Sequence, residues 1–175
     1  MKTFGWKKWI TAAACIISSA AWAQQTAPIP STQILQTTTN NSTPNKPIDK
    51  KYSALKNLSD NIKWTSWVAS NPQTDPTINI QFHGTRYLTA VSIDAGCAAT
   101  NDTYRAFARP KTIVVSGADR SISTNLADRR STQRITITPA MPTDQVTLTI
   151  TDRYTGKHSA VCLSEVHFEE ITLPS

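Results

Sequence analysis

The side chains best suited to catalysis are few and scattered along the sequence. His83, His158 and His167 lie apart, and no oxyanion-hole signature surrounds the Ser164-Glu165 pair that precedes His167. The chain has five glycines, which is little material for a phosphate-binding loop, and it contains no paired-histidine motif. We therefore expect a protein that acts by binding and not by catalysis.

Residues 1–23 have the pattern of a secretory signal peptide. A basic start is followed by an apolar run over residues 9–21, which ends in the small-residue signature Ala21-Trp22-Ala23. The apolar run is too short to span a bilayer as a permanent helix. We expect cleavage after Ala23, no retained membrane span, and an exported protein that is periplasmic or secreted.

The cysteines agree with export. Cys15 lies in the signal peptide and could mark a lipid attachment site, but Ala12 stands where a lipobox usually has Leu, so we expect no lipid. Cys97 and Cys162 remain in the mature chain, and in an oxidising compartment they are expected to form a disulfide. Such a bridge would close a loop of about 65 residues and stabilise the fold by about 4 kcal/mol in the chain-entropy model.

The charge of the mature chain is mild. The formal net charge of the whole sequence is +6, but three of its 18 Lys and Arg lie in the signal peptide, which leaves 15 against 12 Asp and Glu. Nucleic-acid binding normally needs a denser basic stripe, so we expect no nucleic-acid partner. Weak attraction to an acidic surface or glycan is compatible with this charge.

Residues 24–51 are rich in Gln, Thr, Asn, Ser and Pro. Such a segment offers too little apolar surface to offset the entropy lost when it becomes ordered. We expect a disordered linker, which either holds the folded domain away from a surface or has no specific role.

Short segments that alternate between apolar and polar residues follow one another from residue 77 to residue 168. The clearest is residues 145–151, in which Val146, Leu148 and Ile150 share one face and threonines share the other. One face is therefore expected to lie in the core and the other in water. The expected strands cover residues 77–82, 87–93, 112–116, 121–126, 134–138, 145–151 and 162–168.

The last of these segments breaks the alternation. Leu163 is out of phase with Val166 and Phe168, and a β-bulge between them would restore the phase. A helical period is absent from the mature sequence apart from one turn at residues 53–58. The pattern predicts an all-β fold, either a sandwich or a jelly roll.

Three segments resemble a known group of proteins. The segment Asp60-Asn61-Ile62-Lys63-Trp64-Thr65-Ser66-Trp67 resembles the Asp-Gly-Asn-x-x-Thr-x-Trp turn of galactose-binding-like, discoidin-type (coagulation factor type C) β-sandwiches. Residues 104–111, with Arg-Pro-Lys, and residues 152–168, with Tyr-x-Gly and Cys-Leu-Ser-Glu-Val-x-Phe, are similar to the NAD-glycohydrolase-associated glycan-binding domain. The resemblance implies an eight-stranded galactose-binding-like jelly roll over residues 52–170, followed by a tail at 171–175.

The resemblance further implies that loops at one end of the sandwich bind ligand. Sugars present apolar ring faces, hydroxyls and sometimes carboxylates or sulfates, which aromatic side chains and forked donors can match. Packing is the alternative for Arg109 with Tyr154 and for either Trp64 or Trp67. The expected ligand-binding residues are Trp64, Asp102, Tyr104, Arg105, Arg109, Arg153, Tyr154 and His158.

A structural calcium ion is a further implication of the resemblance. Asn61 replaces the usual Gly, which is tolerable because Asn accepts the left-handed backbone conformation. Ile62 replaces a polar residue that often helps to hold the ion, which removes one oxygen from a site that needs about six to eight. Asp60, Thr65 and Glu165 remain as ligands, but on balance we expect no cofactor.

The function that follows is noncatalytic recognition of a glycan or glycoconjugate at the cell envelope or outside the cell. One alternative is a protein-interaction module that uses the same loops to bind a periplasmic or surface protein. A metal-dependent or NAD-directed hydrolase is the third, although the resembling domains are accessory to NAD glycohydrolases. In the resembling fold, the Cys97–Cys162 bridge would pin the loops that carry Tyr104 and Tyr154 side by side.

Overall fold

The structure is a computed structural model that describes residues 25–39, 54–69 and 74–172. The predicted signal peptide and Cys15 lie outside these ranges. The described part contains one short helix, α1 (Asn101–Ala106), and the 3-10 turns η1 (Ser31–Gln33) and η3 (Leu55–Leu58). Its eight strands are β1 (Thr26–Pro28), β2 (Ile34–Thr39), β3 (Trp67–Ala69), β4 (Thr77–Ala95), β5 (Phe107–Ser116), β6 (Ser121–Asn125), β7 (Gln133–Tyr154) and β8 (His158–Ile171).

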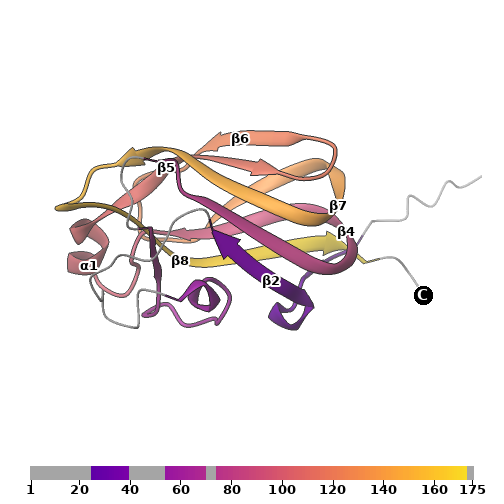
Figure 1. Ribbon diagram of the computed structural model, residues 1–175, viewed down its shortest axis with the longest axis horizontal. Coiled ribbons are helices and arrows are strands. Elements are labelled where there is room, and N and C mark those ends of the chain that lie inside the picture. The colour runs from indigo at the N-terminus through magenta and orange to yellow at the C-terminus, as the bar shows by residue number, and fades with distance from the viewer. Residues whose placement is uncertain (1–24, 40–53, 70–73, 173–175) are drawn as a thin grey trace, which may run out of the picture.

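The long strands β4 and β7 connect the whole sheet. The strand order is β1-β8-β4-β7-β5-β6, with β2 added to β4 and β3 added to β8. Strand β4 pairs with β2 through its first half and with β8 through its second half, and its pairing with β7 is interrupted between Gln81 and Arg86, beside Gly84 with φ of 75°. The sheet therefore changes neighbours along β4 and wraps around the core (Figure 1).

The core is built from the alternating residues of these strands. Ile78 and Phe82 of β4 are buried, and so are Val146, Leu148 and Ile150 of β7, which the sequence places on one face. Burial of such side chains is the main stabilising contribution. The prediction of the apolar face of β7 is confirmed.

The predicted strands are present, and some of them join. The segments at 77–82 and 87–93 are both part of β4, and those at 134–138 and 145–151 are both part of β7. The predicted bulge is also present. Asp94 pairs with Glu165 whereas Ala95 pairs with Leu163, so Ser164 is the extra residue on β8.

The prediction of a disordered linker over 24–51 is wrong for its first part. Strand β1 pairs with residues 169–171 of β8, and β2 pairs with residues 78–82 of β4. Ile29, between the two strands, is buried in the core. Composition alone missed this because added strands are held by backbone hydrogen bonds, which need few apolar side chains. The folded unit therefore begins before residue 52, and residues 40–53 lie outside the described ranges.

The C-terminal boundary moves slightly as well. Ile171 belongs to β8, and the backbone N–H of Thr172 donates to the carbonyl of Gln25. The predicted tail at 171–175 therefore begins later than expected, and residues 173–175 lie outside the described ranges.

Helix α1 occupies a segment that the sequence predicts to be a loop. Thr100 caps the helix, because its hydroxyl accepts from the N–H of Thr103, and the Thr103 hydroxyl accepts in return from the N–H of Thr100. Both residues favour loops by type, which hides the helix start in the sequence. Figure 1 shows α1 at one end of the molecule, away from the end at which β8 finishes.

Candidate ligand-binding site

A pocket of about 440 Å³ opens beside α1. Its wall combines the helix with the start of β5, the loop between β6 and β7, and the turn between β7 and β8. The lining is polar and contains four arginines. The lining residues are Asn101, Tyr104, Arg105, Arg109, Asp128, Arg129, Arg130 and Thr155.

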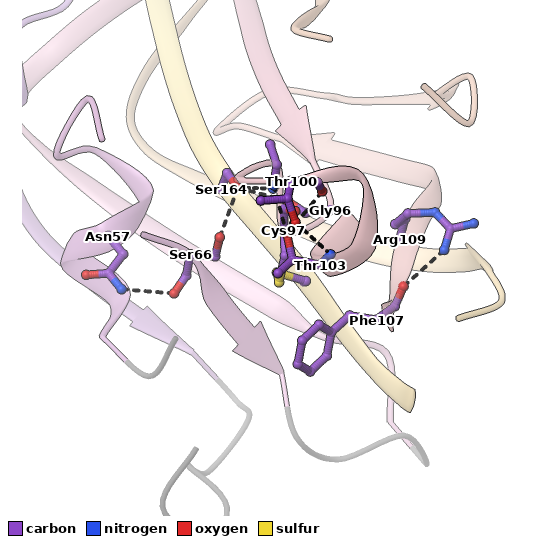
Figure 2. The surroundings of a disulfide bond; sticks show 11 residues. Asn57, Ser66, Gly96, Cys97, Thr100, Thr103, Phe107, Arg109 and Ser164 are labelled. Carbon is purple, nitrogen blue, oxygen red and sulfur yellow. Dashed lines mark hydrogen bonds between the residues drawn. A yellow bond between two sulfur atoms is a disulfide. The ribbon is translucent and has the colours of Figure 1, made fainter. Parts of the chain in front are cut away.

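Arg109 holds the floor of this pocket together. The residue is only 6% exposed, and its guanidinium donates to both carboxylate oxygens of Asp128, through Nε and Nη2, at 2.8 Å each. Nη1 donates to the carbonyls of Phe107 and Thr155, both at 3.0 Å, and Figure 2 shows the first of these bonds. One buried side chain thereby joins three separate chain segments.

Tyr104 is the third member of the cluster that Arg109 and Asp128 form. Its hydroxyl donates to Oδ1 of Asp128 at 3.0 Å, and Cζ of Arg109 lies 5.1 Å from the centre of its ring. Burial and the bond to Asp128 raise the pKa of Tyr104 to about 12. The bond from Arg109 holds the pKa of Asp128 below its usual range, so the pair stays ionised and Tyr104 stays neutral at physiological pH.

Two glycines allow these segments to approach one another. Gly96 has φ of 82°, and a Cβ there would lie 2.7 Å from the ring of Tyr104. A Cβ on Gly156 would overlap the backbone carbonyl of Phe107. The Tyr-x-Gly motif therefore contains a glycine because the turn between β7 and β8 lies directly against the start of β5.

The loop between β6 and β7 is anchored at both ends. The side-chain amide of Gln133 donates to the carbonyl of Ala127 and accepts from its N–H. The hydroxyl of Tyr154 donates to the carbonyl of Leu126 at 2.9 Å. These bonds fix the ends of the segment that places Arg129 and Arg130 at the pocket.

The predicted disulfide between Cys97 and Cys162 is confirmed, with 5.4 Å between the Cα atoms. Thr103 of α1 donates to the carbonyl of Cys97. The bulge residue Ser164 donates to the carbonyl of Gly96 and accepts from the N–H of Ala98 (Figure 2). The disulfide and the bulge together hold the segment that leads into α1.

The structure brings together three of the eight predicted contact residues. Tyr104, Arg105 and Arg109 line the pocket, although Arg109 is committed to the scaffold. Tyr154 also serves the scaffold through its bond to Leu126. The alternative that Arg109 and Tyr154 pack as neighbours agrees with their pairing across β5 and β7.

The other four predicted residues do not line the pocket. Asp102 is exposed in the first turn of α1, and Arg153 is half-buried near the end of β7. The ring of His158 lies 5.3 Å from that of Phe107. Trp64 is 71% exposed in the loop before β3, whereas Trp67 is buried, so one tryptophan is in the core as the sequence predicts.

Sequence reasoning missed five lining residues. The run Asp128-Arg129-Arg130 was the available signal, because it is the densest group of charges between two predicted strands. Nothing local to the sequence shows that this loop lies beside α1. The missed residues are Asn101, Asp128, Arg129, Arg130 and Thr155.

The predicted calcium ligands lie at a second place, the loop from Asp60 to Thr65. The carboxylate of Asp60 accepts from the N–H of Ile62 and from the hydroxyl of Thr65, and Asn61 adopts φ of 60° as expected. Glu165 of β8 is 1% exposed, and neither of its carboxylate oxygens completes a hydrogen bond with the described residues. His167 lies 3.7 Å from one of these oxygens.

Burial of Glu165 as an unpaired carboxylate is energetically unfavourable. Burial, followed by the neighbouring carboxyl of Asp60, raises the pKa of Glu165 to about 7. Protonation of Glu165 would remove the buried negative charge, and a cation bound between Glu165 and Asp60 would neutralise it. The calcium ligand set of Asp60, Thr65 and Glu165 stays a prediction from the sequence. The described residues contain no group of three or more His, Cys, Asp or Glu placed to hold a metal.

The sequence and the fold are similar to those of known protein domains. A family model described as the NAD glycohydrolase translocation F5/8 type C domain matches residues 30–169. No curated protein matches the sequence. No helix of the described residues is long and apolar enough to cross a membrane.

Solved structures with the same fold include carbohydrate-binding modules. The CBM32-1 and CBM32-2 domains of Clostridium perfringens ZmpB in complex with GalNAc align over 82% of this chain and 34% of that chain, with TM-score 0.66 and 8% identity. The family 32 CBM of C. perfringens NanJ in complex with galactose aligns over 83% and 100%, with TM-score 0.59 and 12% identity. The CBM32 of AlyQ in complex with 4,5-unsaturated mannuronic acid aligns over 77% and 94%, with TM-score 0.53 and 12% identity. The likeness confirms the predicted all-β sandwich.

Proposed function

Because this chain belongs to the NAD glycohydrolase translocation F5/8 type C domain family, we propose that it is a noncatalytic module that binds a glycan or glycoconjugate. We further propose that it acts after export, at the cell envelope or outside the cell. The signal-peptide pattern of residues 1–23 and the Cys97–Cys162 disulfide support export.

The observation that carries the glycan proposal is the pocket beside α1. Its volume of about 440 Å³ lies in the range of small-molecule sites, which is about 300–1,000 Å³. Its polar side chains converge from a helix and two loops that Arg109, Gln133 and the disulfide hold in place. A site ordered in advance loses less entropy when a sugar binds.

The structural relatives support a sugar as the ligand but do not identify which sugar this protein binds. Three of them are complexes with GalNAc, with galactose and with 4,5-unsaturated mannuronic acid. Their sequences are so different from this chain that its own lining residues must set the specificity.

A glycan array followed by calorimetric titration of the glycans that bind tests the proposal. We expect Arg105→Ala to weaken binding, because this exposed residue lines the pocket, and Lys56→Ala to serve as a control of equal charge outside it. Absence of binding to every glycan would contradict the proposal. Turnover of NAD by the purified protein would contradict its noncatalytic part.

A protein-interaction module is the second candidate, and one surface favours it. Trp64 and Ile62 are 71% and 39% exposed on the same loop, which offers apolar area to a periplasmic or surface protein. If Trp64→Ala abolished a cross-link to a partner in the exported fraction while the glycan array stayed silent, this candidate would replace the first.

A further inference from the structure

We propose that the pocket beside α1 takes the anionic group of an acidic sugar, either a carboxylate or a sulfate. This inference rests on the proposed function, since it specifies the class of glycan. The observation behind it is a convergence of arginine side chains that the fold itself does not use.

The charges that line the pocket do not balance. Four arginines face one carboxylate, that of Asp128. Both oxygens of Asp128 accept from Arg109, and one of them also accepts from Tyr104. Asp128 and Arg109 therefore neutralise each other, and the remaining charge of the lining is that of Arg105, Arg129 and Arg130.

These three arginines make no close ion pair among the described residues, and Arg105 acts on Asp128 only at longer range, where its charge helps to lower the pKa of that carboxyl. All three are exposed, and no hydrogen bond or ion pair joins their guanidinium groups to another described residue. Like charges that line one pocket repel one another, and a bound anion relieves this repulsion. A carboxylate or sulfate offers the acceptor geometry that guanidinium groups match with two parallel bonds.

The elements that carry the arginines are fixed. Arg105 lies on α1, which Thr100 caps and which Thr103 ties to the disulfide segment. Arg129 and Arg130 lie on the loop that Gln133 closes. Asn101 and Thr155 add neutral polar groups to the lining, suited to sugar hydroxyls.

The surroundings favour a sugar over a nucleic acid. The mature chain carries 15 basic against 12 acidic residues, a smaller excess than nucleic-acid binding normally needs. A backbone of regularly spaced phosphates needs an extended track, whereas one acidic ring needs one pocket.

Calorimetry with matched sugar pairs tests the inference. One pair is an oligogalacturonate and its methyl ester, which differ in the carboxylate alone, and the other is a sulfated galactan oligosaccharide and its desulfated form. We expect the charged member of at least one pair to bind about tenfold more tightly, the effect of one charge-assisted hydrogen bond. Which pair shows the preference distinguishes carboxylate from sulfate.

Variants locate the effect. At least one of Arg105→Gln, Arg129→Gln and Arg130→Gln should abolish the tenfold preference for the charged member, whereas Lys56→Gln, which removes an exposed charge elsewhere, should leave it unchanged. Arg129→Lys keeps the positive charge but loses the paired donors of the guanidinium group. We therefore expect this variant to retain part of the preference for the charged sugar. Because the three arginines have no structural partner, unchanged thermal unfolding checks that each variant is folded.

Three other outcomes would contradict either the inference or the proposed function. Equal binding of charged and neutral members, unaffected by the arginine variants, would overturn the inference and leave the proposed function standing. Equally tight binding of single-stranded DNA would also overturn it, because the site would then be a general polyanion surface. Silence of every glycan would contradict the proposed function itself.

Discussion

Arg109 has the side chain of a ligand-binding residue but directs it at the protein. Its donors go to Asp128 and to the carbonyls of Phe107 and Thr155, so substitution affects the pocket through its walls. The exposed Arg134 offers a comparison, because it makes the same two-bond contact with Glu169 on the surface. The two pairs differ mainly in the arginine, whose side chain is 8% exposed in Arg109 and 46% exposed in Arg134.

Arg109→Lys should lower the free energy of unfolding by about 2 kcal/mol, since lysine cannot reproduce the two-bond contact with Asp128 and the bonds to the carbonyls of Phe107 and Thr155 at once. Arg134→Lys should change it by no more than about 1 kcal/mol, because exposed ion pairs contribute little. Urea denaturation of both variants measures this. Equal losses would show that Arg109 does not hold the pocket together.

Glu165 should make stability depend on pH. Its pKa is raised from 4.5 to about 7 in the folded state, so between these values the folded protein binds more protons than the unfolded chain. The free energy of unfolding should therefore fall as pH rises from about 4.5 to about 7. Glu165→Gln, which imitates the protonated acid, should remove this part of the dependence in denaturation with a chelator present.

Calcium provides the matching control for Glu165. If the loop from Asp60 to Thr65 and Glu165 bind the ion, calcium at pH 8 should restore stability to the wild type and not to Glu165→Gln. The same pH dependence in the variant and the wild type would contradict the assignment to Glu165.

At the scale of elements, the sequence predicts the strands well because their alternation is local. Val146, Leu148 and Ile150 identify the buried face of β7, and the phase shift at Leu163 identifies the bulge. Helix α1 could not be predicted, since Thr100 and Thr103 are as typical of loops as of caps. Strand β2 was missed because its segment resembles a linker in composition.

The candidate site was only partly predictable, for a related reason. Tyr104 and Arg105 lie near a recognisable motif, whereas Arg129 and Arg130 reach the pocket only through long-range contacts. The N–H of Leu126, for example, donates to the carbonyl of Lys111 and brings the loop beside β5. The pairing register of strands that are distant in the sequence cannot be predicted from the residues of any one segment.

The disulfide should contribute at the same scale. Replacing Cys97 and Cys162 with Ser should lower the free energy of unfolding by about 4 kcal/mol, because the unfolded chain regains the entropy of the open loop. It should also weaken glycan binding, since the segment before α1 loses its anchor, while the β content in circular dichroism is retained. Unchanged affinity in a folded variant would show that the bridge does not order the pocket.

At the scale of the whole molecule, the N-terminal segment belongs to the fold. A chain that starts at residue 52, the boundary predicted from sequence, should be markedly less stable than one that starts at residue 24. It would lose the buried side chain of Ile29 and expose the edges of β4 and β8 that β2 and β1 cover. Thermal unfolding of both chains measures this, and equal melting temperatures would contradict the placement of β1 and β2.

Ligand is expected to bind in the pocket beside α1. A crystal structure of the protein with a glycan selected from the array is the most direct measurement. We expect the sugar within hydrogen-bond distance of Arg105 and of Arg129 or Arg130, with Arg109 still paired to Asp128. A sugar bound instead against Trp64, with the arginine pocket empty, would contradict the central claim.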